Sequence, residues 1–263
     1  MSKAAKNDEL MMIATQVAYL NCAEGKTVKQ NIDSIINSYK NNPHPTAADT
    51  AQYNTAVNLR ERLQNDNLSQ CNDWVVRETC DCNNQNGFYG CLIDTNDGDA
   101  ILGFRGSESY DSTQNVNDWV KADFGLLNNS LTAQQKEAED FTNFIYEKYG
   151  DRYNSYNFSG HSLGGNLAEH STINAPNGMH VGRCTSWDGP GFSDEYIATH
   201  LDKINKRANN IDHYQWSIIG TMLIPIPGTN YKTIAAHNGD GLAGVFMRHD
   251  TRNIDFDANG NVV

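Results

Sequence analysis

A serine flanked by glycines is the part of this sequence best suited to nucleophilic chemistry. Gly160, Ser162 and Gly164 form the pattern G-x-S-x-G between a predicted apolar strand and a predicted apolar helix. In that context the pattern is typical of a sharp strand-to-helix turn, which exposes the serine hydroxyl. The positive end of the helix dipole favours negative charge beside it. We therefore expect Ser162 to attack a carbonyl carbon, with the backbone N–H of Leu163 stabilising the oxyanion.

The same segment resembles a known family. The string GHSLGG at 160–165 is similar to the nucleophile turn of the fungal-type (class 3) lipases, and 101–107, followed by Asp118-Trp119 and Ala122-Asp123, resembles the segment that supplies their oxyanion hole and lid. The longer string GHSLGGNLA and the motif DGPGF are closer to a bacterial branch of lipase-like proteins, and related modules are phospholipase toxins. The resemblance spans about 74–250 and implies an α/β-hydrolase fold. It makes Ser107 the second oxyanion contributor, for which a simple turn residue is the alternative.

A nucleophilic serine needs a general base and an acid that orients it, and in this fold they follow in the order serine, acid, histidine. The histidines late in the chain are His200, His213, His237 and His249. His249 is followed by Asp250 near the carboxyl end, where the resembled family carries a late His-Asp motif. We therefore predict His249 as the base, with a surface histidine as the alternative.

The identity of the acid stays open at this stage. Asp188 follows a predicted strand directly after the nucleophile helix, although an Asx-type turn in Asp-Gly-Pro-Gly would also explain it. Asp212 lies near the next predicted strand, which is where class 3 lipases place their acid, but the polar segment before it is a poor strand. Asp240 is a more remote choice. Either strand end could present a carboxylate to the same imidazole.

An apolar, proline-broken run at 218–227 is the feature that favours a lipid substrate. We interpret Met222, Leu223 and Ile224 as the wall of an acyl groove; a buried strand is the alternative. The polar segment 108–115 stands where class 3 lipases carry an amphipathic lid, and this departure favours phospholipids or short esters over neutral fat.

These residues together predict a serine carboxylic-ester hydrolase that acts on lipids through an acyl-enzyme, as a phospholipase A1 or lipase. A short-chain esterase, thioesterase, acyltransferase or peptidase would use the same triad. A non-catalytic binding module is the alternative from another class. The mechanism needs no cofactor. The sequence contains no H-E-x-x-H motif and no histidines and aspartates clustered at metal-ligand spacing, so we predict no metal site.

The elements that must position this chemistry are read from apolar periodicity. Residues 1–70 predict a helical segment packed on the catalytic domain, and 71–263 predict an α/β-hydrolase domain. Asn96-Asp97-Gly98 predicts a hairpin, and Thr132 the start of a long helix. Strand then alternates with helix, which favours a largely parallel sheet with helices on both faces.

Composition limits the partners. The formal net charge of −12 argues against nucleic acid, since phosphate binding needs a basic face. A lipid or ester substrate, transient contact with a membrane surface, and an export or immunity protein are compatible with it. We predict neither signal peptide nor transmembrane helix, and hence a cytoplasmic chain or export by a non-classical route.

Six cysteines leave the redox compartment open. Cys71, Cys80, Cys82 and Cys91 have a symmetric spacing that suggests antiparallel strands and permits disulfides. Reduced thiols are the other interpretation.

Overall fold

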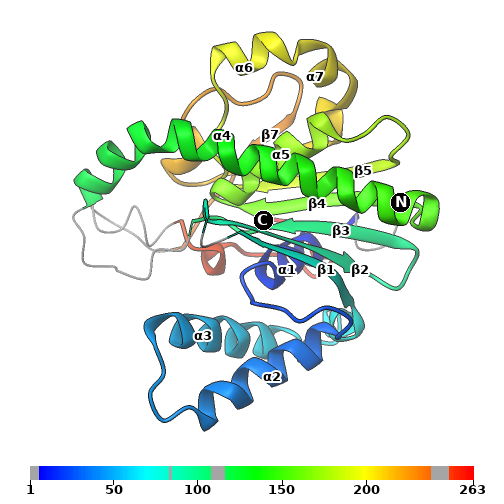
Figure 1. Cartoon of the computed structure of the whole chain (residues 1–263), viewed down its shortest axis with the longest axis vertical. Coiled ribbons are helices and arrows are strands. Elements are labelled where there is room, and N and C mark those ends of the chain that lie inside the picture. The colour runs from blue at the N-terminus through cyan, green and yellow to red at the C-terminus, as the bar shows by residue number, and fades with distance from the viewer. Residues whose placement is uncertain (1–5, 83–84, 108–115, 238–248) are drawn as a thin grey trace.

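The central feature of the fold is a seven-stranded sheet with the strand order β1-β2-β3-β4-β5-β6-β7 (Figure 1). The computed structural model describes residues 6–82, 85–107, 116–237 and 249–263. The strands are β1 (Val75–Cys82), β2 (Phe88–Asp94), β3 (Asp99–Phe104), β4 (Ser155–His161), β5 (Val181–Trp187), β6 (Ile211–Gln215) and β7 (Asn230–Thr233). β1, β2 and β3 pair antiparallel, whereas β3 to β7 run parallel. The predicted fold class, α/β with a largely parallel sheet, is confirmed.

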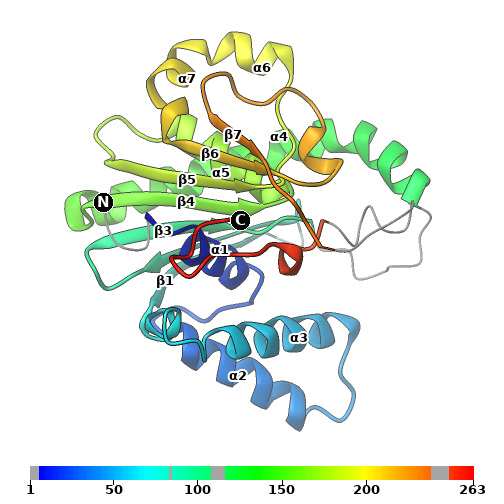
Figure 2. The same cartoon turned by 180° about the vertical axis from the view of Figure 1, so that it is seen from behind.

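Helices cover both faces of this sheet. On one face lie α4 (Val116–Tyr149) and α5 (Leu163–Asn174), with α7 (Leu201–Arg207) packed against α5 and α6 (Asp194–Thr199) beside α7. On the other face α1 (Asp8–Val17) packs against β3 and β4, as the view from behind shows (Figure 2). β2 and β3 are buried along their whole length because both of their faces are covered.

The first helix belongs to the core of the sheet. Leu10, Met11 and Ile13 are fully buried and share one hydrophobic cluster with Ile93 of β2 and Ile101 of β3. Removal of α1 would therefore expose one face of the sheet to water.

α2 (Val28–Asn41) and α3 (Ala47–Arg62) form a helical pair that extends away from the sheet (Figure 1). Thr27 and Thr46 cap their amino ends, and each threonine side chain accepts a hydrogen bond from the backbone N–H of the third residue of its helix in a capping box.

The predicted hairpin is confirmed, whereas the predicted start of the long helix is wrong. Asn96 and Gly98 turn β2 into β3 with positive φ values of 62° and 93°, as an Asn-Asp-Gly turn favours. The long helix begins at Val116 and not at Thr132, so it is 34 residues long. The capping pattern at Thr132 therefore lies inside a helix.

The apolar run at 218–227 is not a buried strand. It contains a 3₁₀ turn, Ile219–Thr221, and one isolated bridge that joins Ile224 to Phe192. Ile218, Leu223 and Ile224 are 54%, 40% and 39% exposed. Prolines at 225 and 227 lack the N–H that a ladder needs, so a regular strand is disfavoured here.

No disulfide joins the six cysteines, all of which lie in the described residues. None of the described helices combines the length and the apolar character needed to cross a bilayer.

Candidate active site

Ser162 occupies a strained turn between β4 and α5. Its φ of 59° and ψ of −132° lie in a region that non-glycine residues rarely adopt. A Cβ at Gly160 would lie 2.0 Å from the carbonyl oxygen of Gly164, and one at Gly164 would lie 2.3 Å from that of Phe104. The two glycines therefore allow the turn to close, and the serine side chain remains partly accessible.

The carboxyl ends of four neighbouring strands meet at this turn. Ser162 follows β4, Asp188 follows β5, and Trp216 with Ser217 follow β6, while Gly106 lies shortly after β3. Parallel strands present their carboxyl ends at one edge, which is where open α/β sheets bind ligands. A Cβ at Gly106 would lie 3.1 Å from the Cβ of Ser162, so the turn after β3 touches the serine.

Asp188 and His249 form a hydrogen-bonded pair at this edge. Nδ1 of His249 lies 2.6 Å from Oδ2 of Asp188, and the carboxylate side chain is completely buried. Because a carboxylate accepts, the Nδ1 nitrogen carries the hydrogen in this contact. Nε2, on the opposite side of the ring, is the nitrogen left to act as a base.

The loop after β6 holds the carboxylate of Asp188. The backbone N–H groups of Trp216 and Ser217 each donate to Oδ1 at 2.9 Å, and the hydroxyl of Ser217 donates to Oδ2. Burial opposes ionisation, but the hydrogen bonds from His249 and Ser217 outweigh it and lower the pKa of Asp188 below its usual value. Asp188 is therefore ionised at neutral pH.

The ring of His249 lies beside the serine turn. It packs on the ring of His161, the residue before Ser162, with a centroid separation of 4.3 Å. Its Nε2 is buried and has no hydrogen-bond partner among the described residues. A buried, unpaired nitrogen next to a serine turn is suited to accept a proton from the serine or from a bound molecule.

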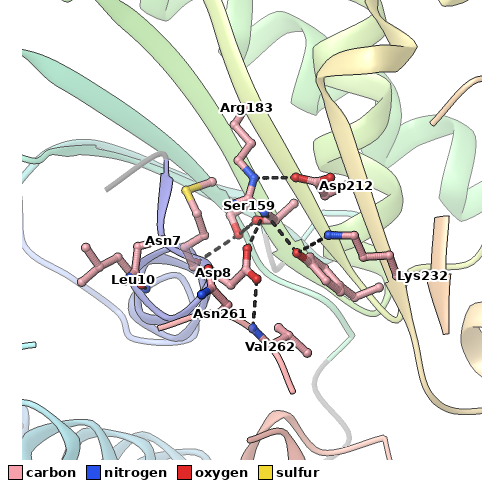
Figure 3. Close-up of polar contacts among 12 residues, drawn as sticks. Asn7, Asp8, Leu10, Ser159, Arg183, Asp212, Lys232, Asn261 and Val262 are labelled. Atoms are coloured by element: carbon pink, nitrogen blue, oxygen red, sulfur yellow. Dashed lines mark hydrogen bonds and ion pairs between the residues drawn. The ribbon is translucent and has the colours of Figure 1, made fainter. Parts of the chain in front are cut away.

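Asp212 lies elsewhere, near the amino ends of β5 and β6. Oδ2 of Asp212 accepts a hydrogen bond from Nε of Arg183 at 2.6 Å, and the same guanidinium also forms an ion pair with Asp8 of α1 (Figure 3). Tyr214 accepts a further hydrogen bond from this arginine at 3.1 Å. Burial works against the charge, but the two carboxylates raise the pKa of Arg183. The structure does not bring Asp212 to His249.

His213 and His237 have acidic partners of their own. Nδ1 of His213 lies 2.5 Å from Oε1 of Glu169 beneath α5, and Nε2 of His237 binds Asp255. Asp240 and the polar segment 108–115 lie outside the described residues.

The two predicted oxyanion contributors belong to α5 and to the loop after β3. Leu163 is the first residue of α5, and the N–H groups of a first helical turn have no partner within the helix. Ser107 follows Gly106 and is exposed. Leu163 directly follows Ser162 in the chain, and Gly106, the neighbour of Ser107, comes close to the Cβ of Ser162.

The predicted acyl-groove residues are tied to the loop that follows Asp188. The carbonyl of Met222 accepts from Gly191 at 2.7 Å, and Ile224 exchanges two backbone hydrogen bonds with Phe192. This leaves the side chains of Leu223 and Ile224 partly exposed. They form an apolar surface on the segment that begins at Ser217.

Three residues of this edge had no part in the sequence prediction. Ser217 contacts both Asp188 and His249, the latter at 3.2 Å from Nδ1. His161 and Tyr19 join the serine turn to the first helix through a contact of 3.1 Å. The position of His161 inside G-x-S-x-G was a signal for it, whereas nothing in the sequence marked Tyr19 or Ser217.

Comparisons with known proteins give a family and two similar structures. A family model described as Mbeg1-like matches residues 59–258. Lip2 lipase from Yarrowia lipolytica is similar with 14% identity and a TM-score of 0.41, over 65% of this chain and 69% of that one. A deletion mutant of Rhizomucor miehei lipase, in complex with its propeptide, is similar with 12% identity and a TM-score of 0.42, over 78% and 67%. No curated protein matches the sequence.

Proposed function

Because the chain belongs to the Mbeg1-like family and pairs a buried acid with a histidine beside a strained serine, we propose that it is a serine carboxylic-ester hydrolase. Its substrates in this proposal are lipids, and its activity is that of a phospholipase A1 or a lipase. Ser162 is the nucleophile, His249 the base and Asp188 the acid.

The observation that carries the proposal is the hydrogen bond between His249 and Asp188. It fixes the hydrogen on Nδ1 and leaves Nε2 as the free base, which is the arrangement that a serine nucleophile needs. The lowered pKa of Asp188 keeps the carboxylate charged, so it stabilises the imidazolium that forms during the reaction. Asp212 is already paired with Arg183 and has no such role in the proposal.

The first half of the reaction forms an acyl-enzyme. Oγ of Ser162 bonds to the ester carbonyl carbon while its proton passes to Nε2 of His249. The N–H groups of Leu163 and Ser107 stabilise the negative oxygen that results. The carbon–oxygen ester bond then breaks, and the leaving alcohol takes the proton from His249.

The second half releases the acid. A water molecule attacks the acyl carbon and gives a proton to Nε2 of His249. The bond from this carbon to Oγ breaks, Ser162 recovers its proton, and the carboxylic acid leaves. The chain returns to its starting state without a cofactor.

The exposed apolar side chains of Leu223 and Ile224 support a lipid as the source of the acyl group. They follow Ser217 by a few residues, so they lie on the segment that holds Asp188. Apolar side chains beside polar reactive groups are typical of sites for amphipathic ligands. Transient contact with a lipid surface is part of the same proposal.

Fatty-acid release from vesicles of phosphatidylcholine with triacylglycerol tests the proposal. We expect release by the wild type, loss of at least about a thousandfold in Ser162→Ala and Asp188→Asn, and near wild-type rates in Asp212→Asn, the matched control. Equal losses in the two aspartate variants would contradict the assignment of the acid.

The same assay separates the alternatives. Turnover of p-nitrophenyl butyrate or of an acyl thioester without release from vesicles would indicate a short-chain esterase or a thioesterase, and transfer to an added alcohol an acyltransferase. A folded wild type that reacts with neither these substrates nor a fluorophosphonate probe at Ser162 would indicate a non-catalytic binding module.

A further inference from the structure

A chain of hydrogen bonds joins the first helix of the protein to the candidate base. Tyr19 lies two residues after α1, and its hydroxyl is 3.1 Å from Nδ1 of His161. Nε2 of His161 is 2.7 Å from the backbone carbonyl oxygen of His249. The backbone N–H of Gly106 donates to the same tyrosine oxygen at 3.2 Å.

The donors in this chain can be assigned from the groups themselves. The carbonyl of His249 only accepts, so Nε2 of His161 carries a hydrogen. A neutral imidazole then accepts at Nδ1, and the hydroxyl of Tyr19 donates to it. Burial, together with the neighbouring imidazole of His249, lowers the pKa of His161 to about 3, so the ring of His161 stays neutral. One tautomer of His161 therefore satisfies both neighbours.

The loop that carries Tyr19 is itself held in place. Nε of Arg105 donates to the carbonyl of Ala18 at 2.9 Å, and a second nitrogen of the guanidinium donates to Asn21 at 2.9 Å. The side chain of Gln52, from α3, donates to the carbonyl of Tyr19 at 2.8 Å. The backbone on both sides of Tyr19 is thus fixed, so the hydroxyl has a defined position relative to the serine turn.

We propose that Tyr19 and His161 are positioning residues that hold the backbone of His249 and the turn at Gly106 against Ser162. The inference rests on the proposed function, in which His249 is the base and the residue after Gly106 contributes to the oxyanion hole. Tyr19 precedes the residues that the family model matches, 59–258. A segment outside the family match therefore completes the site.

The arrangement makes one side chain serve two parts of the reaction. The hydroxyl oxygen of Tyr19 accepts a hydrogen bond from the N–H of Gly106 and donates one to His161, which in turn contacts the backbone of His249. Its loss would leave a backbone donor and an imidazole nitrogen without their partners, and both lie in contact with the serine turn. The expected cost falls on the rate of the chemical step, because small displacements of reacting groups lower rate more than binding.

Steady-state kinetics on p-nitrophenyl butyrate with the full chain tests the inference. We expect Tyr19→Phe to lower kcat about tenfold while KM stays within about twofold, since one neutral hydrogen bond has this scale. Tyr156→Phe is the matched control, because its buried hydroxyl binds the carbonyl of Gly150 at the end of α4. It should lower the melting temperature without lowering kcat.

A double-mutant cycle distinguishes positioning from a loss of stability. His161→Phe keeps a ring against Trp216 but breaks both hydrogen bonds. Because the two residues act through the same contact, Tyr19→Phe should lower kcat little further in the His161→Phe background. His161→Gln, whose amide can still donate to the carbonyl of His249, should recover part of the rate.

If the wild type is active and Ser162-dependent, but Tyr19→Phe retains full kcat and behaves like Tyr156→Phe, the positioning role is refuted while the hydrolase stands. If the wild type hydrolyses no ester in a Ser162-dependent way, the proposed function itself fails.

Discussion

Arg183 donates from Nε to Oδ2 of Asp212 at 2.6 Å, and this ion pair joins β5 to β6 near their amino ends. The same guanidinium binds Asp8, so one arginine links two strands to α1. Each of the three side chains is at most 15% exposed. We therefore expect the carboxylate of Asp212 to contribute to stability and not to contact the serine turn, which lies at the opposite ends of these strands.

Asp212→Asn should therefore weaken folding and leave the chemical step unchanged. We expect the free energy of unfolding to fall by about 1–3 kcal/mol, because a partly buried charge loses a partner. Urea unfolding measures this, and kcat on a soluble ester should stay within about twofold. A large fall in kcat at unchanged stability would return Asp212 to the list of candidate acids.

Ser217→Ala should slow the reaction. The substitution removes the hydroxyl that donates to Oδ2 of Asp188, while the two backbone N–H groups still donate to Oδ1. We expect kcat to fall about tenfold, which corresponds to one hydrogen bond to a charged group. Ser193→Ala, which removes only the cap of the exposed helix α6, is the control and should keep its kcat. Equal rates in the two variants would refute a role for Ser217 in orienting the acid.

Glu169 and His213 predict a pH dependence of stability. Both side chains are fully buried, and although burial disfavours the imidazolium, the carboxylate outweighs it and raises the pKa of His213. A histidine whose pKa is raised in the folded state stabilises the fold in full at pH values below its unfolded pKa of about 6.5. This stabilisation is lost as the pH rises through the folded-state pKa. Above pH 6 the carboxyl of Asp188 stays ionised in both states, so it adds nothing to the change.

Urea unfolding of the wild type and of Glu169→Gln at pH 6 and pH 9 checks this. His161, with its lowered pKa, contributes equally in both proteins, so the difference between them is the measure. From pH 6 to pH 9 the wild type should lose stability relative to the variant, which should itself be less stable by about 3–5 kcal/mol at pH 6 because one partner of a buried pair is removed. Parallel pH profiles for the two proteins would contradict a charged His213.

Gly160→Ala should abolish hydrolysis through a steric clash. Its Cβ would lie 2.0 Å from the carbonyl oxygen of Gly164, which belongs to the backbone of α5 and cannot move aside. We expect kcat to fall by at least about a hundredfold, because the serine turn must open. Gly150→Ala is the control, since a Cβ there meets nothing within 4 Å and only the positive φ of 47° is strained. It should cost about 1 kcal/mol of stability and no activity.

The serine turn could be predicted from the sequence because its causes are local. Gly160 and Gly164 are required by atoms of the turn itself and of the adjacent strand β3, and the strand and helix on either side have clear apolar patterns. The sheet could be predicted for the same reason, from the alternation of strand and helix. The turn at Asn96 followed from the residues that favour a positive φ.

The choice between Asp188 and Asp212 could not be made from the sequence. Both stand close to strands, and what separates them is the loop after β6, whose N–H groups bind Asp188, and Arg183, which binds Asp212. These partners are about 28 to 29 residues away along the chain, so only the folded sheet brings them together. Tyr19 lies 142 residues from His161 and left no local pattern at all.

The place of α1 in the core has a consequence for how the chain is made. One of its two partner strands, β4, is synthesised about 145 residues later, and only then can the hydroxyl of Ser159 donate to the carbonyl of Met11. At roughly 5–20 residues per second, the ribosome needs about 7 to 30 seconds to supply that strand. Until both β3 and β4 have been made, the apolar side chains of α1 are only partly covered, and we expect the nascent helix to bind chaperones that capture apolar peptides. The same delay keeps Tyr19 away from the serine turn, and His249, the proposed base, is made later still, so we expect a growing chain to be inactive until His249 has emerged.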